Sequence, residues 1–419
     1  MPRLFDPIAI GPLTLQNRVL RSATHEGMAD PAGNPTPALA GLYRRLLDSG
    51  AGGVITGCVA VSADSTTLQG MCVLDSDRRV ALWRDVLGRE LTAVGAPLIV
   101  QLVHGGGQAL GPRTQAPSRR KYNPGGHVAE AMADSQIEQA IQSFVGAIRR
   151  ARDIGFAGAQ LHAAHGYLLA QFLSPLFNRR TDPWGGTLAN RVRIVEQILA
   201  RARRSAPDFP VLVKISAYSF SPGDSGVEDA ARTAALLEQA GCSAIEVSCG
   251  NLEDGFSTTR CPAVPSKAVV TLMSRFGRMP AVAKSIVRLC VPFVLRRRRP
   301  LHNYNVAAAR QVKSAVKIPV IVTGGIRTLA DMERIVGDGD ADCVALCRPF
   351  IAEPDIVERL RAGQARSRCT DCCWCMIGAV EHPLRCYGVK AEAFTAEPVL
   401  NSAEANAAFA ERSRREGHR

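Results

Sequence analysis

The chain has 419 residues, of which 46% are hydrophobic, and its mean hydropathy is close to zero. This length and composition predict a globular protein with a large core, built as one α/β domain with insertions or as two smaller domains. The net charge of +13 suits an anionic ligand, but no nucleic-acid-binding motif accompanies it, and we expect no nucleic-acid partner. No apolar run approaches the length of a bilayer span, and the N-terminus lacks the regions of a signal peptide, so we expect a cytoplasmic protein.

Eight short apolar runs with β propensity alternate along the chain with segments of helical spacing. The predicted strands are Arg18–Thr24, Gly53–Val59, Pro97–Val103, Phe156–Leu161, Pro210–Ser216, Ala244–Ser248, Pro319–Thr323 and Asp342–Leu346. The predicted helices are Pro37–Ser49, Arg78–Val94, Ser135–Ile154, Thr187–Ser205, Val227–Ala240, Val306–Ala315, Leu329–Val336 and Asp355–Ala362. This alternation predicts an α/β fold, a (β/α)8 TIM barrel with a C-terminal cysteine-rich extension, and leaves a doubly wound sheet as the alternative.

We expect the barrel to occupy residues 1–362 and the extension residues 363–419. The third predicted helix is expected to begin at Ser135, with Glu138 completing a capping box. Between the sixth and seventh strands, residues 251–305 form an insertion that contains the basic and apolar segment Met279–Arg299. A basic amphipathic helix of this kind suits a membrane surface, but long loops in enzymes often cover the active site, and we favour a lid over the barrel mouth.

The stretch LHAAHGYL carries His162, His165 and Tyr167 at the end of the fourth predicted strand. The active site of a TIM barrel lies at the carboxyl ends of its strands, so these three side chains are expected to converge there. Two neutral imidazoles can hold a carbonyl or phenolate oxygen, and a phenol beside them can donate a proton. The alternative is a hydrogen-bonded core histidine, a surface histidine and a tyrosine that only packs.

Polar residues at the ends of other predicted strands extend this site. Gly324 and Gly325 follow the seventh strand and Arg348 follows the eighth, which is where TIM barrels bind phosphate. The alternatives are an ordinary tight turn for the glycines and a surface ion pair for the arginine. Lys214 lies late in an apolar strand, where a buried ammonium needs a negative partner unless it reaches solvent.

Five of the thirteen cysteines lie between Cys369 and Cys386. A reducing compartment argues against disulfides there and favours a metal site or a redox role. Cys369, Cys372, Cys375 and Cys386 follow the spacing C-x2-C-x2-C-x10-C. Four thiolates at this spacing suit a [4Fe–4S] cluster, with zinc as the second candidate and an empty site as the third.

Several strings together resemble the old yellow enzyme family of FMN-dependent NAD(P)H oxidoreductases. The resemblance covers roughly residues 4–360 and is carried by LFDPIAIGPLTLQNRVLRSAT, QLVHGGGQ, LHAAHGYLLAQFLSPLFNRRTDPWGG, VTGGI and ALCRPFIAEPD. The fourth-strand string is very specific to the family.

The resemblance implies a role for each matching position. It places His162 and His165 on the substrate oxygen and makes Tyr167 the general acid. The positions that it implies for FMN are Ser22, Ala23, Thr24, His25, Cys58, Gln101 and Lys214 along the ring, with Gly324, Gly325, Cys347 and Arg348 at the phosphate.

This chain departs from the family at two of these positions. Lys214 replaces the usual arginine, which keeps the positive charge but loses the bidentate fork. His25 replaces the usual threonine or cysteine, and a histidine there is expected to titrate near neutral pH and make the flavin potential depend on pH.

The cysteine cluster resembles that of the 2,4-dienoyl-CoA reductase and trimethylamine dehydrogenase branch, although that branch spaces its third cysteine one residue further on. In that branch an FAD/NAD domain follows and supplies electrons. Only 33 residues follow Cys386 here, so a cluster would take electrons from a separate electron-transfer protein, or be structural or a relic.

The sequence therefore predicts an enzyme that reduces the C=C bond of an α,β-unsaturated carbonyl, including enoyl or dienoyl thioesters, by ping-pong hydride transfer from NAD(P)H. One alternative is a flavin-dependent demethylase or desaturase with an external electron partner. An alternative from another class is a non-redox barrel that binds a phosphorylated ligand, or an interaction protein on a membrane surface. Homo-oligomers are compatible with each of these functions.

Overall fold

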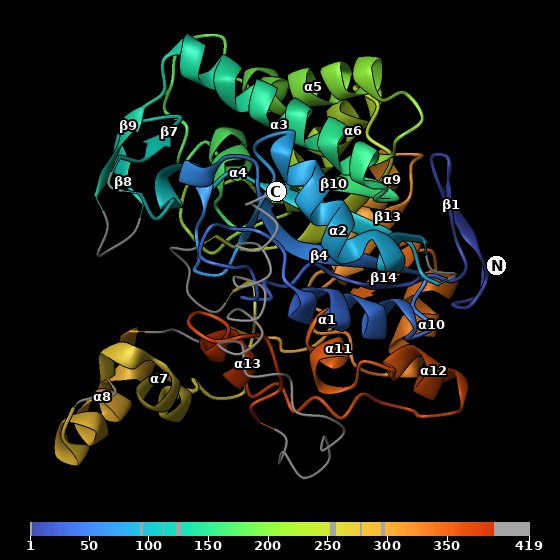
Figure 1. Ribbon diagram of the computed structural model, residues 1–419, viewed down its shortest axis with the longest axis vertical. Coiled ribbons are helices and arrows are strands. Elements are labelled where there is room, and N and C mark those ends of the chain that lie inside the picture. Colours follow the sequence, from blue (N-terminus) through green and yellow to red (C-terminus); the bar gives the residue numbers. More distant parts are fainter. Residues whose placement is uncertain are drawn as a thin grey trace, which may run out of the picture.

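A computed structural model of the protein describes residues 2–92, 95–111, 113–122, 127–251, 257–276, 279–294 and 298–388. Eight parallel strands form a closed barrel (Figure 1). They are β3 (Val19–Arg21), β4 (Gly53–Ala60), β6 (Leu98–Val103), β10 (Gly158–Ala163), β11 (Val211–Ser216), β12 (Ile245–Ser248), β13 (Val320–Thr323) and β14 (Cys343–Leu346). Strand β3 pairs with both β14 and β4, which closes the sheet and confirms the TIM barrel over the doubly wound alternative.

An antiparallel hairpin that the sequence pattern did not indicate packs on the interior of the barrel. It is formed by β1 (Ile8–Ile10) and β2 (Leu13–Leu15). Ile10 and Leu15 are fully buried and join side chains from the early parts of the barrel strands, such as Leu20, Ile55 and Ile99. This apolar layer fills the end of the barrel opposite to the site, so the polar interior is confined to the other end.

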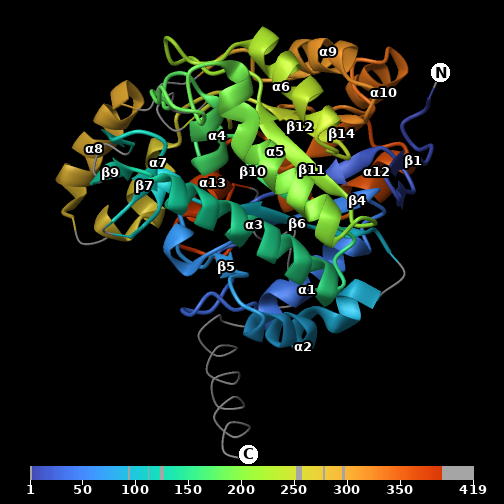
Figure 2. The same ribbon diagram turned by 90° about the horizontal axis from the view of Figure 1, so that it is seen from above.

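Helices surround the barrel (Figures 1 and 2). They are α1 (Pro37–Leu47), α2 (Arg78–Thr92), α3 (Asp134–Ile154), α5 (Leu188–Ser205), α6 (Val227–Gln239), α9 (Val306–Ala315), α10 (Leu329–Gly337) and α12 (Ile356–Arg361). Their apolar faces and the outer faces of the strands share one large core, in which Trp83 meets Phe156 edge-on with ring centroids 5.6 Å apart. All eight overlap the helices expected from the sequence.

The expected capping box of the third helix is wrong. Helix α3 begins at Asp134, so Ser135 lies inside it. The side-chain carbonyl of Gln136 accepts a hydrogen bond of 2.8 Å from the backbone N–H of Ala133, which satisfies a donor at the helix start. Glu138 pairs instead with Arg201 on the neighbouring helix.

Shorter elements are inserted between these units or follow them. They are the strands β5 (Cys72–Val73), β7 (Gln115–Ala116), β8 (Arg120–Lys121) and β9 (Val128–Ala131), the helices α4 (Leu168–Leu173), α7 (Ser266–Leu272), α8 (Ala281–Val294), α11 (Arg348–Ala352) and α13 (Trp374–Gly378), and 3-10 turns at Ala63–Ser65, Gly106–Gln108 and Ser274–Phe276. Strands β7, β8 and β9 form a small separate sheet. In the described ranges, no helix combines the length and the apolar character that crossing a bilayer requires.

The cysteine-rich extension does not form a separate body in its described part. The backbone N–H of Ser367 donates to the carbonyl of Arg327 at 2.9 Å, and that of Leu384 donates to Glu26 at 2.8 Å. Helix α13 packs against α7 of the insertion through a small apolar cluster that includes Cys261 and Ile377. Extension and insertion thus meet beside the mouth of the barrel. Residues 389–419, with the basic tail, lie outside the described part.

Candidate active site

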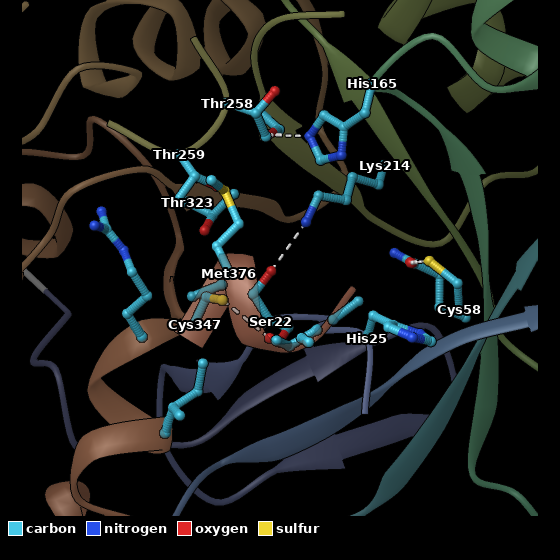
Figure 3. A pocket seen from close by; sticks show the side chains of 18 of the residues that line it. Ser22, His25, Cys58, His165, Lys214, Thr258, Thr259, Thr323, Cys347 and Met376 are labelled. Atoms are coloured by element: carbon cyan, nitrogen blue, oxygen red, sulfur yellow. Dashed lines mark hydrogen bonds between the residues drawn. The ribbon is translucent and has the colours of Figure 1, made fainter. Parts of the chain in front are cut away.

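A cavity opens at the carboxyl ends of the barrel strands (Figure 3). All three predicted catalytic residues and all eleven positions predicted for FMN line it: Ser22, Ala23, Thr24, His25, Cys58, Gln101, His162, His165, Tyr167, Lys214, Gly324, Gly325, Cys347 and Arg348. These positions are spread over more than 320 residues of sequence, and the parallel barrel brings them to one end because each lies in the second half of a strand or follows one.

His162, His165 and Tyr167 form a compact group. The ring centroids of His162 and His165 are 4.9 Å apart, and those of His162 and Tyr167 are 5.0 Å apart, all edge to face. His162 is the penultimate residue of strand β10, whereas His165 has a left-handed backbone with φ of 60°, which turns the chain sharply after the strand. The backbone N–H of His165 donates to Ser216 Oγ at 3.0 Å and fixes this turn.

Both imidazoles are neutral in the folded protein. Burial, and then the nearby ammonium of Lys214, lower the pKa of His162. Burial and the neighbouring His162 lower the pKa of His165. Nε2 of His165 lies 2.8 Å from Ser248 Oγ, whereas the buried Nδ1 of His162 has no hydrogen-bond partner among the described residues. A buried nitrogen without a partner is costly, and a ligand oxygen in the cavity would satisfy it.

Tyr167 is held as a phenol. Burial, and then the nearby Cys58, raise its pKa above the ordinary value, and its side chain is hydrogen-bonded to Thr67. A phenol beside two neutral imidazoles supplies hydrogen-bond donors without a fixed charge.

His25 does not titrate near neutral pH, which corrects the expectation from the sequence. Burial lowers its pKa to about 4, although a backbone hydrogen bond with Gln69 opposes this effect. Nε2 of His25 lies 3.1 Å from the carbonyl oxygen of Gln69. The ring is therefore neutral at pH 7.

Lys214 has a negative partner that belongs to the protein itself. Its Nζ lies 2.9 Å from Glu246 Oε1, and the two side chains are 4% and 0% exposed. Nζ also donates to Ser22 Oγ at 2.9 Å (Figure 3), and Ser22 Oγ donates to Glu246 Oε1 at 2.6 Å. Strand register creates the pair, because Lys214 of β11 lies directly opposite Glu246 of β12.

Side-chain hydrogen bonds continue from this pair across the inside of the barrel. Gln160 donates to Glu246 at 2.7 Å, Gln101 donates to Gln160 at 2.6 Å, and the thiol of Cys58 lies 3.1 Å from Gln101 Oε1. Register again sets the order, since Gln101 lies opposite both Cys58 and Gln160. The chain forms a polar floor under the cavity and satisfies groups that would otherwise be buried without partners.

Gly324, Gly325, Cys347 and Arg348 lie at the other end of the cavity. A Cβ on Gly325 would come within 2.3 Å of the carbonyl oxygen of Leu301, so packing alone already requires glycine there. Arg348 is buried and its Nη1 lies 3.0 Å from Asp371 Oδ1.

Asp371 in the cysteine-rich extension joins two arginines at this end of the cavity. Arg327 donates through Nε to the same carboxylate oxygen at 3.0 Å. Burial alone would raise the pKa of Asp371, but Arg327 and Arg348 outweigh it, so the net shift is downward. Two guanidinium groups and one carboxylate leave a positive charge beside the two glycines.

The four predicted metal ligands are not assembled as a ligand set. Of the four, Cys375 lines the cavity and is buried, whereas Cys369, Cys372 and Cys386 are partly exposed. Across the described part of the chain, no group of three or more His, Cys, Asp or Glu side chains is arranged to hold a metal ion. Iron–sulfur and zinc therefore remain predictions, without support from the side-chain positions.

The insertion contributes its two ends, and not α8, to the cavity wall. Thr258, Thr259 and Tyr304 line the cavity, whereas α8 supplies no lining residue. The extension closes the same side with Cys375, Met376, Ala379, Val380 and Leu384. The lid expected over Met279–Arg299 is therefore not found at α8, which lies at the edge of the molecule (Figures 1 and 2).

Sequence reasoning missed Glu246, Gln160, Arg327 and Asp371. The signal for the first two was a polar residue inside an otherwise apolar strand, which demands a partner when it is buried. Asp371 lies between Cys369 and Cys372, and the spacing of the cysteines carries no signal for a carboxylate that pairs with arginines.

The closed barrel and the donor-lined cavity at its carboxyl end define a TIM-barrel enzyme. Residues 3–255 and 265–367 match the NADH:flavin oxidoreductase / NADH oxidase family, and the chain belongs to this family of oxidoreductases. This confirms the resemblance found in the sequence.

The relatives that match this chain differ from one another in length. It is 29% identical over 386 residues to an NADH oxidase of Thermoanaerobacter brockii, a match that covers 90% of this chain and 54% of the relative. It is 28% identical over 359 residues to an NADPH dehydrogenase of Geobacillus sp., a match that covers 84% of this chain and 91% of the relative. The chain spans about half the length of the first relative and of a metal reductase of Desulforamulus reducens.

Many solved structures share the fold, among them a 2-naphthoyl-CoA reductase and an old yellow enzyme homologue. A 2-naphthoyl-CoA reductase in complex with 2-naphthoyl-CoA has a TM-score of 0.75 at 22% identity, covering 92% of this chain and 56% of that chain. An old yellow enzyme homologue from Zymomonas mobilis has a TM-score of 0.68 at 21% identity, and the match covers 91% of this chain and 100% of the homologue.

Substitution of Glu246 by glutamine is expected to destabilise the protein by about 3–5 kcal/mol, because it leaves the ammonium of Lys214 buried without a charged partner. Urea unfolding of flavin-free protein measures this loss. Adding Lys214→Met to Glu246→Gln should recover much of it, since the unpaired charge is then removed. Equal stability of Glu246→Gln and the unsubstituted protein would show that the pair is not needed.

Stability is expected to fall between about pH 6.5 and pH 4. Burial lowers the pKa of His25 and of His104 to about 4, so the unfolded chain binds more protons than the folded protein in this window. His104→Gln should reduce the difference between urea midpoints at pH 7 and pH 5, and the exposed His127→Gln serves as the control. An unchanged difference in His104→Gln would contradict the assignment.

Proposed function

We propose that the cavity binds FMN and that the protein uses NAD(P)H to reduce the C=C bond of an α,β-unsaturated carbonyl. The observation that carries this proposal is the group of His162, His165 and Tyr167 around a buried imidazole nitrogen that lacks a partner. Membership of the NADH:flavin oxidoreductase family supports a flavin as the cofactor and a nicotinamide as the reductant.

The residues of the cavity fit a phosphorylated, planar cofactor. The phosphate would lie beside Gly324 and Gly325, where Arg327 and Arg348 outnumber the carboxylate of Asp371 and leave a net positive charge. The side chains of the polar floor, Lys214 among them, would hold the ring. When bound, FMN would supply the chemistry of accepting a hydride from NAD(P)H and returning it to a second substrate in a ping-pong cycle.

The two histidines are assigned to the substrate oxygen. A neutral imidazole donates through one nitrogen only, and Nδ1 of His162 is available to do so. When Ser248 Oγ donates to Nε2 of His165, the proton of that ring lies on Nδ1, which becomes a second donor. Two donors on one carbonyl oxygen would draw electrons from the alkene and make its β-carbon electrophilic.

Tyr167 is assigned to proton transfer. Its raised pKa keeps the phenol protonated at neutral pH. The proton would pass from its hydroxyl to the α-carbon of the substrate as the β-carbon receives hydride. Apolar wall residues such as Leu68, Met71 and Val380 suit the hydrocarbon body of an unsaturated carbonyl.

A second candidate is a flavin-dependent demethylase or desaturase that exchanges electrons with a separate protein. It is favoured by the place of the extension, which puts Cys375 in the cavity wall, and by the greater length of several relatives. A pure phosphate-ligand binder is disfavoured, because it has no use for a proton donor beside two oxygen-binding imidazoles.

Tyr167→Phe is expected to retain flavin reduction by NAD(P)H and to slow reoxidation by an enone by about 10²-fold or more, since only the second half-reaction needs the proton. Stopped-flow absorbance of the two half-reactions separates the effects. His162→Ala should in contrast raise KM for the enone. Equal loss of both half-reactions in Tyr167→Phe would remove the role given to Tyr167.

An absorption spectrum of protein purified without oxygen is the most direct test of the cofactors. Flavin bands with no iron would match a single-cofactor ene-reductase. Iron and sulfide in the sample, together with a broad shoulder that dithionite bleaches, would restore the cluster on Cys369, Cys372, Cys375 and Cys386 and favour the electron-partner alternative. Absence of flavin after reconstitution with FMN would overturn the proposal.

A further inference from the structure

Helix α8 exposes a stripe of large apolar side chains. Val282, Ile286, Leu289 and Phe293 are 73%, 57%, 72% and 84% exposed. At 3.6 residues per turn, these four positions fall within about 60° of one another on the helix surface. Clustered exposure of this kind marks a site of contact with a partner or a lipid surface.

The opposite side of α8 explains how the helix is held. Val291 packs with the apolar cluster formed by α7 and α13, and Val287 is half-buried. The helix is thus attached to the protein by one face and presents the other outward. In both ribbon views α7 and α8 project from the edge of the barrel (Figures 1 and 2).

The segment that carries the stripe is basic, although Glu381 of the extension contacts it by accepting a hydrogen bond of 2.7 Å from the backbone N–H of Ser274. From Ser257 to Pro300 the sequence has no Asp or Glu. Lys267, Arg275, Arg288 and Arg299 are exposed within this segment. A partner must therefore offer both an apolar phase and negative charge, a combination that a bilayer containing anionic phospholipid provides.

Charge also distinguishes between the partners that could cover the apolar stripe of α8. A second copy of the same basic face would bring like charges together, and a nucleic acid would leave the apolar stripe in water. The helix has 14 residues, fewer than the roughly 20 that cross a hydrocarbon core, so it would lie along the surface.

We propose that α8 docks the protein on an anionic phospholipid surface. Leu289 and Phe293 enter the boundary between headgroups and acyl chains, while Arg288 and the basic residues that flank the helix meet the phosphates. Thr259 and Tyr304 line the cavity. Helix α8 lies between them in the sequence, so the docked segment is connected to the cavity wall at both of its ends.

Flotation of the flavin-loaded protein with vesicles tests this proposal. Vesicles of phosphatidylcholine alone are compared with vesicles that also contain phosphatidylglycerol. The unsubstituted protein is expected to float with the anionic vesicles, to remain behind with the neutral ones, and to be released by high salt. Leu289→Ser with Phe293→Ser should lower the bound fraction at low salt by at least about tenfold.

Two controls make the result specific. Leu110→Ser removes an exposed leucine, 59% accessible, from another part of the surface and should bind as the unsubstituted protein does. Flavin content and NADH oxidation in solution should be unchanged in both variants, which shows that they are folded.

Three outcomes would overturn the proposal. They are no vesicle binding, equal binding to both kinds of vesicle, and an equal loss in Leu110→Ser. Light scattering that shows a dimer which Leu289→Ser with Phe293→Ser dissociates, without vesicle binding, would assign the stripe to a second copy of the chain instead.

Discussion

The buried ion pair between Lys214 and Glu246 is the constraint on which the polar end of the barrel depends. A TIM barrel normally fills its interior with apolar side chains, and a charge placed there needs a partner of opposite sign. Glu246 supplies that partner. Gln160 and Ser22 donate hydrogen bonds to its carboxylate, and Gln101 in turn donates to Gln160. The network leaves a floor that is polar and hydrogen-bonded, in which the carboxylate of Glu246 balances the positive charge of Lys214.

A second carboxylate plays a comparable part at the other end of the cavity. Asp371 belongs to the extension, yet it joins Arg327 and Arg348, which follow different barrel strands. This carboxylate draws the extension against the barrel and shapes the wall of the cavity. Of the four predicted metal ligands in the extension, Cys375 lines the cavity, whereas Cys369, Cys372 and Cys386 do not.

The insertion divides into parts with different physical roles. Its two ends line the cavity, where Tyr304 donates through its hydroxyl to the carbonyl of Thr258 at 2.9 Å. Its middle, α8, turns outward and carries apolar side chains that the rest of the described chain does not cover. A single insertion therefore closes one side of the cavity and presents a basic, apolar surface outward on α8.

The sequence by itself determined the barrel and the residues around its mouth. Strand–helix alternation sets the number of units, and parallel strands place every strand end on one side, so the sequence is enough to assign His162, Lys214 and Arg348 to one site. Tertiary structure alone decided the partners of those residues. Whether Lys214 meets Glu246 depends on strand register, whether His25 is charged depends on its burial, and where α8 points depends on its packing against α7. Each of these follows from contacts between segments that no local pattern specifies.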